Sequence, residues 1–271
     1  LLYSTHGRRA FDETRIMMAI DNNLRLSYLK EMGITVWKQR FPDSERVNFA
    51  SNSPQEEKDS EDVPILTEEL PTPQTMTDTW EHLLDEINHC SNCHLCQSRN
   101  KIVPGVGDPK ADWLFVGEGP GYFEDQQGEP FVGRSGKLLD NMMARMFLKR
   151  GENVYIANIV KCRASNAGKD RQPTEAECAI CMPFLERQIA LINPKIIVAL
   201  GKTAATALLN ISREASLSSM RKKEHYYSNG SQKIPLVVTY HPSYLLRTPL
   251  GKRQAWEDLC QAMEIFETIE S

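Results

Sequence analysis

The sequence predicts an α/β fold of three layers, in which a mostly parallel central sheet carries helices on both faces. Short apolar runs that suit single strands alternate along the chain with longer segments of helical periodicity. The run 195–200, KIIVAL, is apolar after its lysine, as expected of a strand that is covered on both faces. The apolar run 113–116 leads directly into the glycine-rich loop 117–121, and sheets of this kind bind ligands at the carboxyl ends of their strands.

The first 77 residues differ in composition from the rest of the chain. Residues 1–42 contain one short helical pattern, from Asp21 to Met32, and we expect this small element either to dock a partner or to pack on the main body. Residues 43–77 are rich in Ser, Glu, Asp and Pro, which predicts a disordered linker. The main domain is therefore predicted to span residues 78–271.

The charge of the chain is unevenly distributed. The net charge of −4 divides into −5 for residues 1–78, with 9 Lys and Arg against 14 Asp and Glu, and +1 for residues 79–271, with 23 against 22. A nearly neutral domain permits contact with nucleic acid through a local basic patch, but does not argue for it. No apolar run approaches the roughly 20 residues of a membrane span, so no membrane contact is expected.

The elements of the main domain can be placed in order. Asp78-Thr79-Trp80-Glu81 resembles a capping box, and it begins a helix whose apolar spacing continues to Ile87, just before Cys90. Beyond the strand at 113–116 we expect a helix at 135–150, a strand at 154–160, a helix at 173–192 with a capping box, a strand at 195–200, a helix from 203, an irregular basic segment at 211–233, a strand at 234–239 and a closing helix at 252–269.

Seven cysteines in a chain without a visible secretory signal favour metal or cluster ligation over a disulfide framework. Cys93-x2-Cys96 is a close pair, and Cys162 and Cys178 follow far along the chain with fifteen residues between them. Four thiolates suit either a tetrahedral zinc site or a [4Fe–4S] cluster, and buried, unligated cysteines are the simpler alternative. Two further cysteines each lie three residues from a member of this set and compete with it: Cys90 and Cys181.

Four side chains near the expected strand ends are the candidate site residues. Glu118 is the lone carboxylate in the loop after 113–116, and Phe131 lies in a second glycine-containing segment. Asn158 belongs to the second strand, and His241 precedes Pro242 after the strand at 234–239. Each also has a purely structural interpretation, as a turn residue, a core aromatic or a strand-end cap, and taken singly these positions leave both interpretations open.

Between residues 90 and 260 a set of motifs occurs in a fixed order: Cys93-x2-Cys96, Val103-Pro104-Gly105, Gly117-Glu118-Gly119-Pro120-Gly121, Pro130-Phe131-Val132-Gly133, Asn158 with Lys161-Cys162-Arg163, Pro173-Thr174, Cys178 and His241-Pro242. In this order they resemble the family 4 uracil-DNA glycosylases, the iron–sulfur branch of the uracil-DNA glycosylase superfamily. Two positions depart from the pattern, because Gly119 stands where the family commonly has Ala, and Ala164 where it often has Pro.

The resemblance implies a uracil-DNA glycosylase-like fold and a monofunctional enzyme that hydrolyses the N-glycosidic bond of uracil in DNA during base excision repair. It implies a [4Fe–4S] cluster rather than zinc, on Cys93, Cys96, Cys162 and Cys178. It also implies a uracil pocket in which Glu118 and His241 are catalytic, formed by Gly117, Glu118, Gly119, Phe131, Asn158 and His241. DNA contacts are expected at two places: at Lys161 and Arg163, which would meet phosphates, and at the loop of Leu245, Leu246 and Arg247, which would enter the duplex.

Two other functions compete with this interpretation. A non-catalytic, iron–sulfur nucleic-acid-binding protein would keep the fold and the cluster without the chemistry. A nucleotide-binding protein would use 117–121 as a phosphate cradle, but the Lys-Ser/Thr of a P-loop is absent.

The expected partner is uracil-containing DNA, single- or double-stranded, and the expected form is a monomer in the prokaryotic cytosol. Tyr28–Arg40 faintly resembles the N-terminal peptide of the psi subunit of the bacterial replicative polymerase, which suggests a replication-machinery partner for the N-terminal element.

Overall fold

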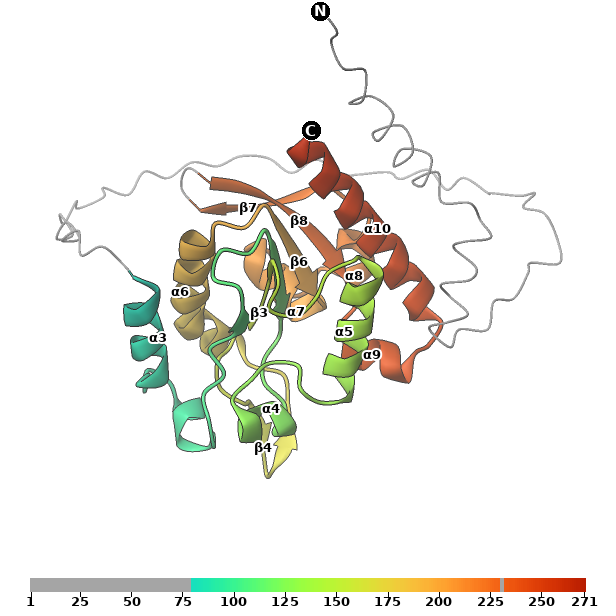
Figure 1. The fold of residues 1–271 in the computed structure, drawn as a ribbon. Helices are drawn as coiled ribbons and strands as arrows, with labels where there is room; N and C mark the ends of the chain where they lie inside the picture. Colours follow the sequence, from blue (N-terminus) through green and yellow to red (C-terminus); the bar gives the residue numbers. More distant parts are fainter. Residues whose placement is uncertain (1–78, 230–231) are drawn as a thin grey trace, which may run out of the picture. The chain divides into compact units, whose positions relative to one another are not determined.

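The computed structural model describes residues 79–229 and 232–271. The predictions for the N-terminal element and the linker lie outside these residues. The described chain forms a six-stranded sheet in the order β1-β3-β2-β6-β8-β7, with helices on both faces, which confirms the predicted three-layer α/β fold (Figure 1). None of its helices is both long and apolar enough to cross a membrane.

Four parallel strands form the centre of the sheet, namely β2 (Trp113–Gly117), β3 (Val154–Asn158), β6 (Ile196–Leu200) and β8 (Gln232–Thr239). The first three are buried at every residue, because both of their faces are covered. Antiparallel strands close both edges, with β1 (Val106–Gly107) beside β3 and β7 (His225–Asn229) beside β8. All four central strands therefore present their carboxyl ends at one side of the sheet.

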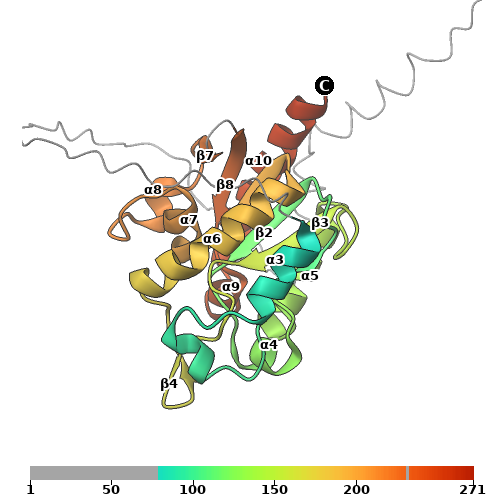
Figure 2. The ribbon, with the colours of Figure 1, turned by 90° about the vertical axis from the view of Figure 1, so that its left-hand side faces the viewer.

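One face of the sheet is covered by α3 (Trp80–Asn88), α6 (Glu175–Ile192), α7 (Lys202–Leu208) and α8 (Leu217–Met220), whose buried side chains share one core with the strands. Figure 2 shows α6 and α3 lying in front of the sheet. On the other side lie α5 (Arg134–Arg145), α9 (Pro242–Arg247) and α10 (Gly251–Glu270), and α10 stacks Phe266 against Trp113 of β2 with 4.8 Å between ring centroids.

The capping boxes and glycines define helix ends much as the sequence predicts. The Thr79 side chain accepts from the backbone N–H of His82, and Thr174 and Glu177 form the reciprocal capping box of α6. Several elements differ from the prediction. The short helix α4 (Tyr122–Gln127) was not predicted, α5 ends five residues early, before Phe147 at φ 59°, and the segment 211–233 contains α8 and the strand β7. A small hairpin, β4 (Ser165–Asn166) with β5 (Lys169–Asp170), lies apart from the main sheet.

Candidate functional site

The carboxyl ends of the parallel strands surround one cleft of about 1060 Å³. Glu118 follows β2, Asn158 ends β3, and His241 lies two residues after β8, so three strands each bring a predicted residue to this edge. Phe131, from the loop between α4 and α5, also lines the cleft. The structure thus brings together the four side chains that the sequence placed near strand ends.

Asn158 holds a buried acceptor that has no partner. Its Oδ1 is buried without a hydrogen-bond partner in the described part of the chain. A Cβ on Gly117 would lie 2.4 Å from this oxygen and 2.6 Å from Cζ of Phe131, so any side chain there must displace the Asn158 amide and the Phe131 ring. Because an unsatisfied buried acceptor costs about 1–3 kcal/mol, the cleft is built for a ligand that donates a hydrogen bond beside an aromatic ring.

The backbone of Phe131 is held in an unusual conformation. Its φ is 55°, a value that bulky residues rarely adopt. Arg150 donates to the carbonyl oxygens of Phe131 at 2.9 Å and Pro130 at 3.0 Å. A Cβ on Gly136 would lie 1.7 Å from the Phe131 oxygen, so the first turns of α5 pass directly against this loop. The ring is therefore fixed before any ligand arrives, at 5.5 Å between centroids from the ring of His241.

Glu124 ties the two glycine-rich loops together, a role that the sequence did not reveal. Its carboxylate is buried, and it accepts from the backbone N–H of Gly121 at 3.2 Å. It also accepts from the N–H groups of Val132 at 3.2 Å and Gly133 at 3.3 Å. One side chain thus fixes the loop after β2 relative to the loop that carries Phe131.

His241 is neutral near neutral pH, and its proton position is defined. Burial lowers its pKa to about 4, and the charge of Arg247 adds to this effect. Nδ1 accepts from the backbone N–H of Ser243 at 3.2 Å and lies 2.8 Å from the Ser243 hydroxyl oxygen. Since Nδ1 accepts a backbone hydrogen, the single ring proton resides on Nε2, which makes His241 a neutral donor.

Glu118 is held by a residue that the sequence analysis missed. The Thr203 hydroxyl, at the start of α7, donates to Glu118 Oε2 at 2.5 Å. The amide nitrogen of Gln172 lies 3.5 Å from the same oxygen. Thr203 is buried at the start of α7, where its hydroxyl is already engaged by Glu118. No sequence signal marked it, because its distance of 85 residues from Glu118 is bridged only in the folded chain.

The predicted DNA contacts divide into residues that face the cleft and residues that do not. Lys161 is 1 % exposed, and its ammonium donates to the Asn158 carbonyl at 2.8 Å and to Gln188 Oε1 at 2.6 Å. Burial lowers its pKa to about 8. This position does not suit the phosphate contact expected of Lys161, and the side chain instead supports the backbone of Asn158.

Arg163 is also turned inward. It is buried and donates to Asp170 Oδ1 at 2.6 Å and to the Gly168 carbonyl at 2.8 Å, so the phosphate contact expected of it is not available either. Leu245 is buried in α9 and cannot serve as a wedge, because the core already occupies its contacts. Leu246 and Arg247 are exposed and line the cleft, as a DNA-entering loop requires.

Two cations at the cleft were not predicted. Arg134, the first residue of α5, and Lys202, the first of α7, are exposed and line the same cleft as Arg247. Within residues 79–229 and 232–271 none of these three has an ion-pair partner, in contrast with Arg163. Unpaired cations around the mouth of a cleft are suited to phosphates.

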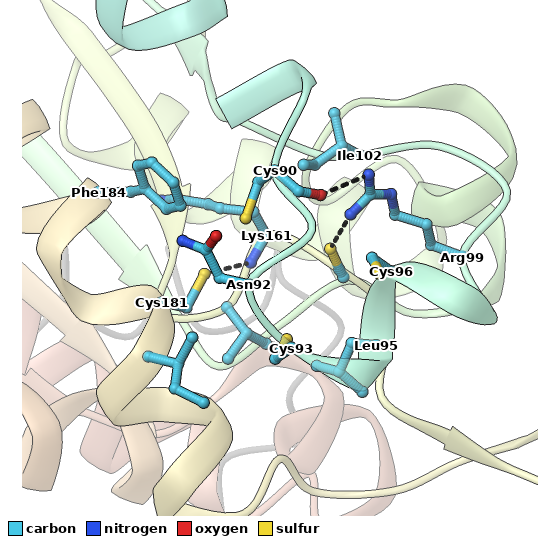
Figure 3. A pocket seen from close by; sticks show the side chains of 13 residues that line it. Cys90, Asn92, Cys93, Leu95, Cys96, Arg99, Ile102, Lys161, Cys181 and Phe184 are labelled. Atoms are coloured by element: carbon cyan, nitrogen blue, oxygen red, sulfur yellow. Dashed lines mark hydrogen bonds between the residues drawn. The ribbon is translucent and has the colours of Figure 1, made fainter. Parts of the chain in front are cut away.

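A second, small cavity is lined by five cysteines from three parts of the chain: Cys90, Cys93, Cys96, Cys162 and Cys181. Figure 3 labels four of them, Cys90, Cys93, Cys96 and Cys181. Cys178 is not among them, and its sulfur accepts from Arg213 at 3.0 Å instead. The structure therefore does not bring together the predicted set, because Cys178 lies one turn too early on α6. Arg99 donates to the Cys162 sulfur at 3.2 Å and to the Cys90 carbonyl at 2.8 Å.

Electrostatic effects link four of the five thiols. Burial raises the pKa of Cys162 to about 11, and Cys181 and Cys93 add to this rise. Burial also raises the pKa of Cys181, with further contributions from Cys90 and Cys93. Cys96 lines the same cavity, and its charge raises the pKa of Arg99. In the described chain no three His, Cys, Asp or Glu side chains are close enough together to hold a single metal ion.

Fold and cleft together define an α/β protein that binds a planar, hydrogen-bond-donating ligand at the carboxyl ends of its strands. A family model described as the uracil DNA glycosylase superfamily matches residues 104–260. The chain belongs to this superfamily and, within it, to the type-4 uracil-DNA glycosylases.

Three relatives illustrate the similarity, and each bears the name type-4 uracil-DNA glycosylase. The protein of Thermotoga maritima is 41 % identical over 195 residues, which cover 71 % of this chain and 97 % of the relative. That of Archaeoglobus fulgidus is 39 % identical over 187 residues, 68 % of this chain and 92 % of the relative. That of Sulfurisphaera tokodaii is 38 % identical over 193 residues, 70 % of this chain and 86 % of the relative.

Proposed function

We propose that this protein is a monofunctional DNA glycosylase that hydrolyses the N-glycosidic bond of uracil in DNA, releases the free base and leaves an abasic site. The observation that carries the proposal is the unpaired, buried Oδ1 of Asn158 beside the ring of Phe131. Uracil meets both features, because it is planar and carries an N3–H donor next to its O4 acceptor. Such an enzyme takes its base out of the DNA stack and reads its pairing edge in a pocket.

Recognition in this proposal rests on the amide of Asn158. Its Oδ1 accepts from N3–H of uracil, while its amide NH2 donates to O4. Cytosine presents the opposite groups at these two positions, an acceptor at N3 and a donor at the exocyclic amine. The ring of Phe131 provides the stacking surface, and Gly117 gives the base room to reach the amide. The ammonium of Lys161, held by Gln188, donates to the carbonyl of Asn158 and so fixes its backbone.

Departure of the base requires stabilisation of the negative charge that develops on it. The neutral ring of His241 donates through Nε2 to a carbonyl oxygen of the departing base. A preorganised donor of this kind favours the transition state over the ground state, because the charge appears only as the bond breaks. Because His241 is already neutral near neutral pH, its Nε2–H is available as a donor without any change in protonation.

Glu118 serves the sugar side of the reaction. Its carboxylate, held by Thr203, either orients the attacking water or stabilises the positive charge on the sugar. Both roles need the carboxylate in a fixed place, and the hydrogen bond from Thr203 holds it there.

We propose that the cysteine cavity holds a [4Fe–4S] cluster through Cys90, Cys93, Cys162 and Cys181, a revision of the predicted set. The four thiols line one cavity together with Cys96, whereas Cys178 lies outside it, which supports Cys181 over Cys178. Cysteine-only ligation is typical of [4Fe–4S] clusters, and the membership of the chain in the type-4 family supports a cluster over zinc. When bound, the cluster supplies a structural link between the 90–96 loop and α6, since hydrolysis moves no electrons.

The DNA strand lies across the cleft mouth in this proposal, with phosphates near Arg134, Lys202 and Arg247. A monomer that acts in the prokaryotic cytosol is part of the same proposal, and so is a replication-machinery partner for residues 1–42. The non-catalytic alternative is less well supported, because Glu118, Phe131, Asn158 and His241 line one cleft together.

The full-length, iron-loaded protein can be tested on a labelled single-stranded oligonucleotide that contains one uracil, followed by alkali. We expect a strand break at the uracil and none in a matched thymine oligonucleotide. Without alkali the strand should stay intact, because a monofunctional enzyme leaves the abasic site uncleaved. If the uracil strand survives alkali, the protein is not a glycosylase and the binding-protein alternative stands.

A further inference from the structure

Two aromatic side chains stand at the mouth of the cleft without any role in the chemistry above. Tyr122 is 51 % exposed and Phe123 is 59 % exposed, and both line the cleft together with Phe131 and His241. They are adjacent residues of α4, with their rings edge to face at 5.4 Å between centroids. Large aromatic rings exposed at the rim of a binding cleft indicate a contact surface for a ligand.

The two rings are presented by a segment that is firmly held. Glu124 binds the loops on both sides of α4 through backbone N–H groups. Asp125 is fully buried and accepts from the backbone and side-chain amides of Asn100 at 2.9 and 2.6 Å. The guanidinium of Arg163 lies 5.1 Å from the ring centroid of Tyr122. A ligand that stacks on these rings therefore does not have to order them first.

The cleft has more space than one extruded base needs. Its volume of about 1060 Å³ is at the upper end of the range for drug-sized ligands. Arg134, which is exposed and has no ion-pair partner among the described residues, lines the cleft two positions after Val132, whose N–H anchors the loop to α4. A cation beside exposed rings matches a phosphate beside unstacked bases, as in surfaces that bind single-stranded nucleic acid.

We propose that Tyr122 and Phe123 form a stacking platform for the unpaired bases that flank the extruded uracil, so that single-stranded DNA is the preferred substrate; this inference rests on the proposed function. Bases of a single strand expose their faces and can stack on the rings, whereas those of a duplex already stack on their neighbours. The platform acts on substrate capture and not on bond breakage, because the groups assigned to base recognition and departure, Asn158 and His241, lie on other elements.

The test compares kcat and KM on uracil in a single strand and in a duplex. The variant Tyr122→Leu/Phe123→Leu keeps apolar side chains but removes both π faces. Because stacking contributes roughly 1–3 kcal/mol per base, we expect its KM on the single strand to rise about 5- to 100-fold, with kcat and the duplex KM within about twofold of wild type. Phe147→Leu is the matched control, because Phe147 is 86 % exposed and does not line the cleft.

A second measurement keeps this inference separate from the proposed function. The Kd for a uracil-free single strand, from fluorescence anisotropy, should weaken by a similar factor in the double leucine variant and recover in Tyr122→Trp/Phe123→Tyr. An unchanged KM and Kd in the leucine variant, or equal rises on single strand and duplex, would overturn the platform. If the wild type binds single strands through these rings but releases no uracil, the proposed function fails while the platform stands.

Discussion

Gly117 leaves the amide oxygen of Asn158 free to receive a ligand. A Cβ at position 117 would lie 2.4 Å from Asn158 Oδ1, closer than any unshifted side chain can come, and that oxygen has no partner in the described structure. Gly117, the last residue of β2, pairs in register with Asn158, the last residue of β3. This pairing places the missing side chain of Gly117 opposite the unpaired acceptor of Asn158. We therefore expect recognition of the base to depend on Gly117 and Asn158.

Gly117→Ala should therefore damage recognition while the protein still folds. The added methyl must push aside the Asn158 amide and the Phe131 ring, and small displacements in an active site lower rates by on the order of 100-fold. We expect a loss of this size in kcat/KM on uracil. Gly133→Ala is the control, since its Cβ would meet nothing nearer than 3.5 Å and should change kcat/KM far less. Equal losses in both variants would contradict the assigned role.

Asn158→Asp tests the reading of the pairing edge. A carboxylate only accepts hydrogen bonds, so it cannot donate to O4 of uracil. Sites that hydrogen-bond a polar group reject a mismatched one by up to about 10⁴- to 10⁵-fold, and we expect single-turnover uracil release to fall by at least about 1000-fold. Cytosine release should become measurable, because its amine donates to the new carboxylate. Uracil release within tenfold of wild type would show that Asn158 does not read the base.

Thr203→Val tests the support of Glu118. The substitution keeps the shape of the side chain and removes the hydroxyl that donates to Glu118 Oε2 at 2.5 Å. Hydrogen bonds to charged groups contribute about 1.5–3 kcal/mol, so we expect kcat to fall about 10- to 100-fold with little change in KM. Thr203→Ser keeps the hydroxyl and should retain most of the rate. A serine variant as slow as the valine variant would point to packing instead.

The pH profile tests the state of His241. Because burial lowers its pKa to about 4, the neutral donor persists well below the ordinary value near 6.5. We expect log kcat/KM to stay flat from about pH 8 to about pH 5 and to decline only as the pH falls towards 4. An acid limb centred near 6.5 would mean that the working form of His241 is not the buried, neutral ring.

The lowered pKa of His241 also makes the stability of the folded protein decrease at acid pH. A histidine with a lowered pKa in the folded state binds fewer protons there than in the unfolded chain, so the folded state loses stability as the pH falls from about 6.5 to about 4. His241→Asn should flatten this part of the stability curve. Thermal unfolding of both proteins across that range would show whether the slope belongs to His241.

Two cysteines three residues apart on α6 distinguish the cluster ligands. Cys181 lines the cysteine cavity, whereas the Cys178 sulfur faces Arg213. We expect Cys181→Ser to lose most of its bound iron and visible absorbance, while Cys178→Ser keeps both close to wild type. Iron content and absorbance measured on freshly purified, anaerobic protein decide between them. Loss of iron in Cys178→Ser but not in Cys181→Ser would restore Cys178 as the ligand on α6, and the same comparison of Cys96→Ser with Cys90→Ser decides the other revised position.

The sequence predicted the central sheet well, because buried parallel strands such as Ile196–Leu200 are apolar runs that few other structures explain. It placed Glu118, Phe131, Asn158 and His241 correctly as a group, since each lies near a strand end or a glycine-rich turn. It could not separate Cys178 from Cys181, because residues three apart on a helix share a face. The choice depends on how α6 lies against the 90–96 loop.

The sequence also could not show which of the predicted DNA contacts face the cleft. Lys161 and Arg163 follow a strand and look like surface cations, yet both turn inward to carbonyl and side-chain acceptors far along the chain or in the adjoining hairpin. Arg134 and Lys202 begin helices, where a cation has no special pattern, and only the convergence of loops brings them to the cleft. Thr203 was not predicted as a site residue, because only the folded chain brings it to Glu118.

The most direct test of the central claim is single-turnover release of free base by the wild-type, iron-loaded protein from four matched single strands that carry uracil, thymine, cytosine or adenine at one position. We expect release of uracil alone, and loss of that release in Asn158→Asp. Release of no base, or release of uracil that is unaffected by substitution of Asn158, would contradict it.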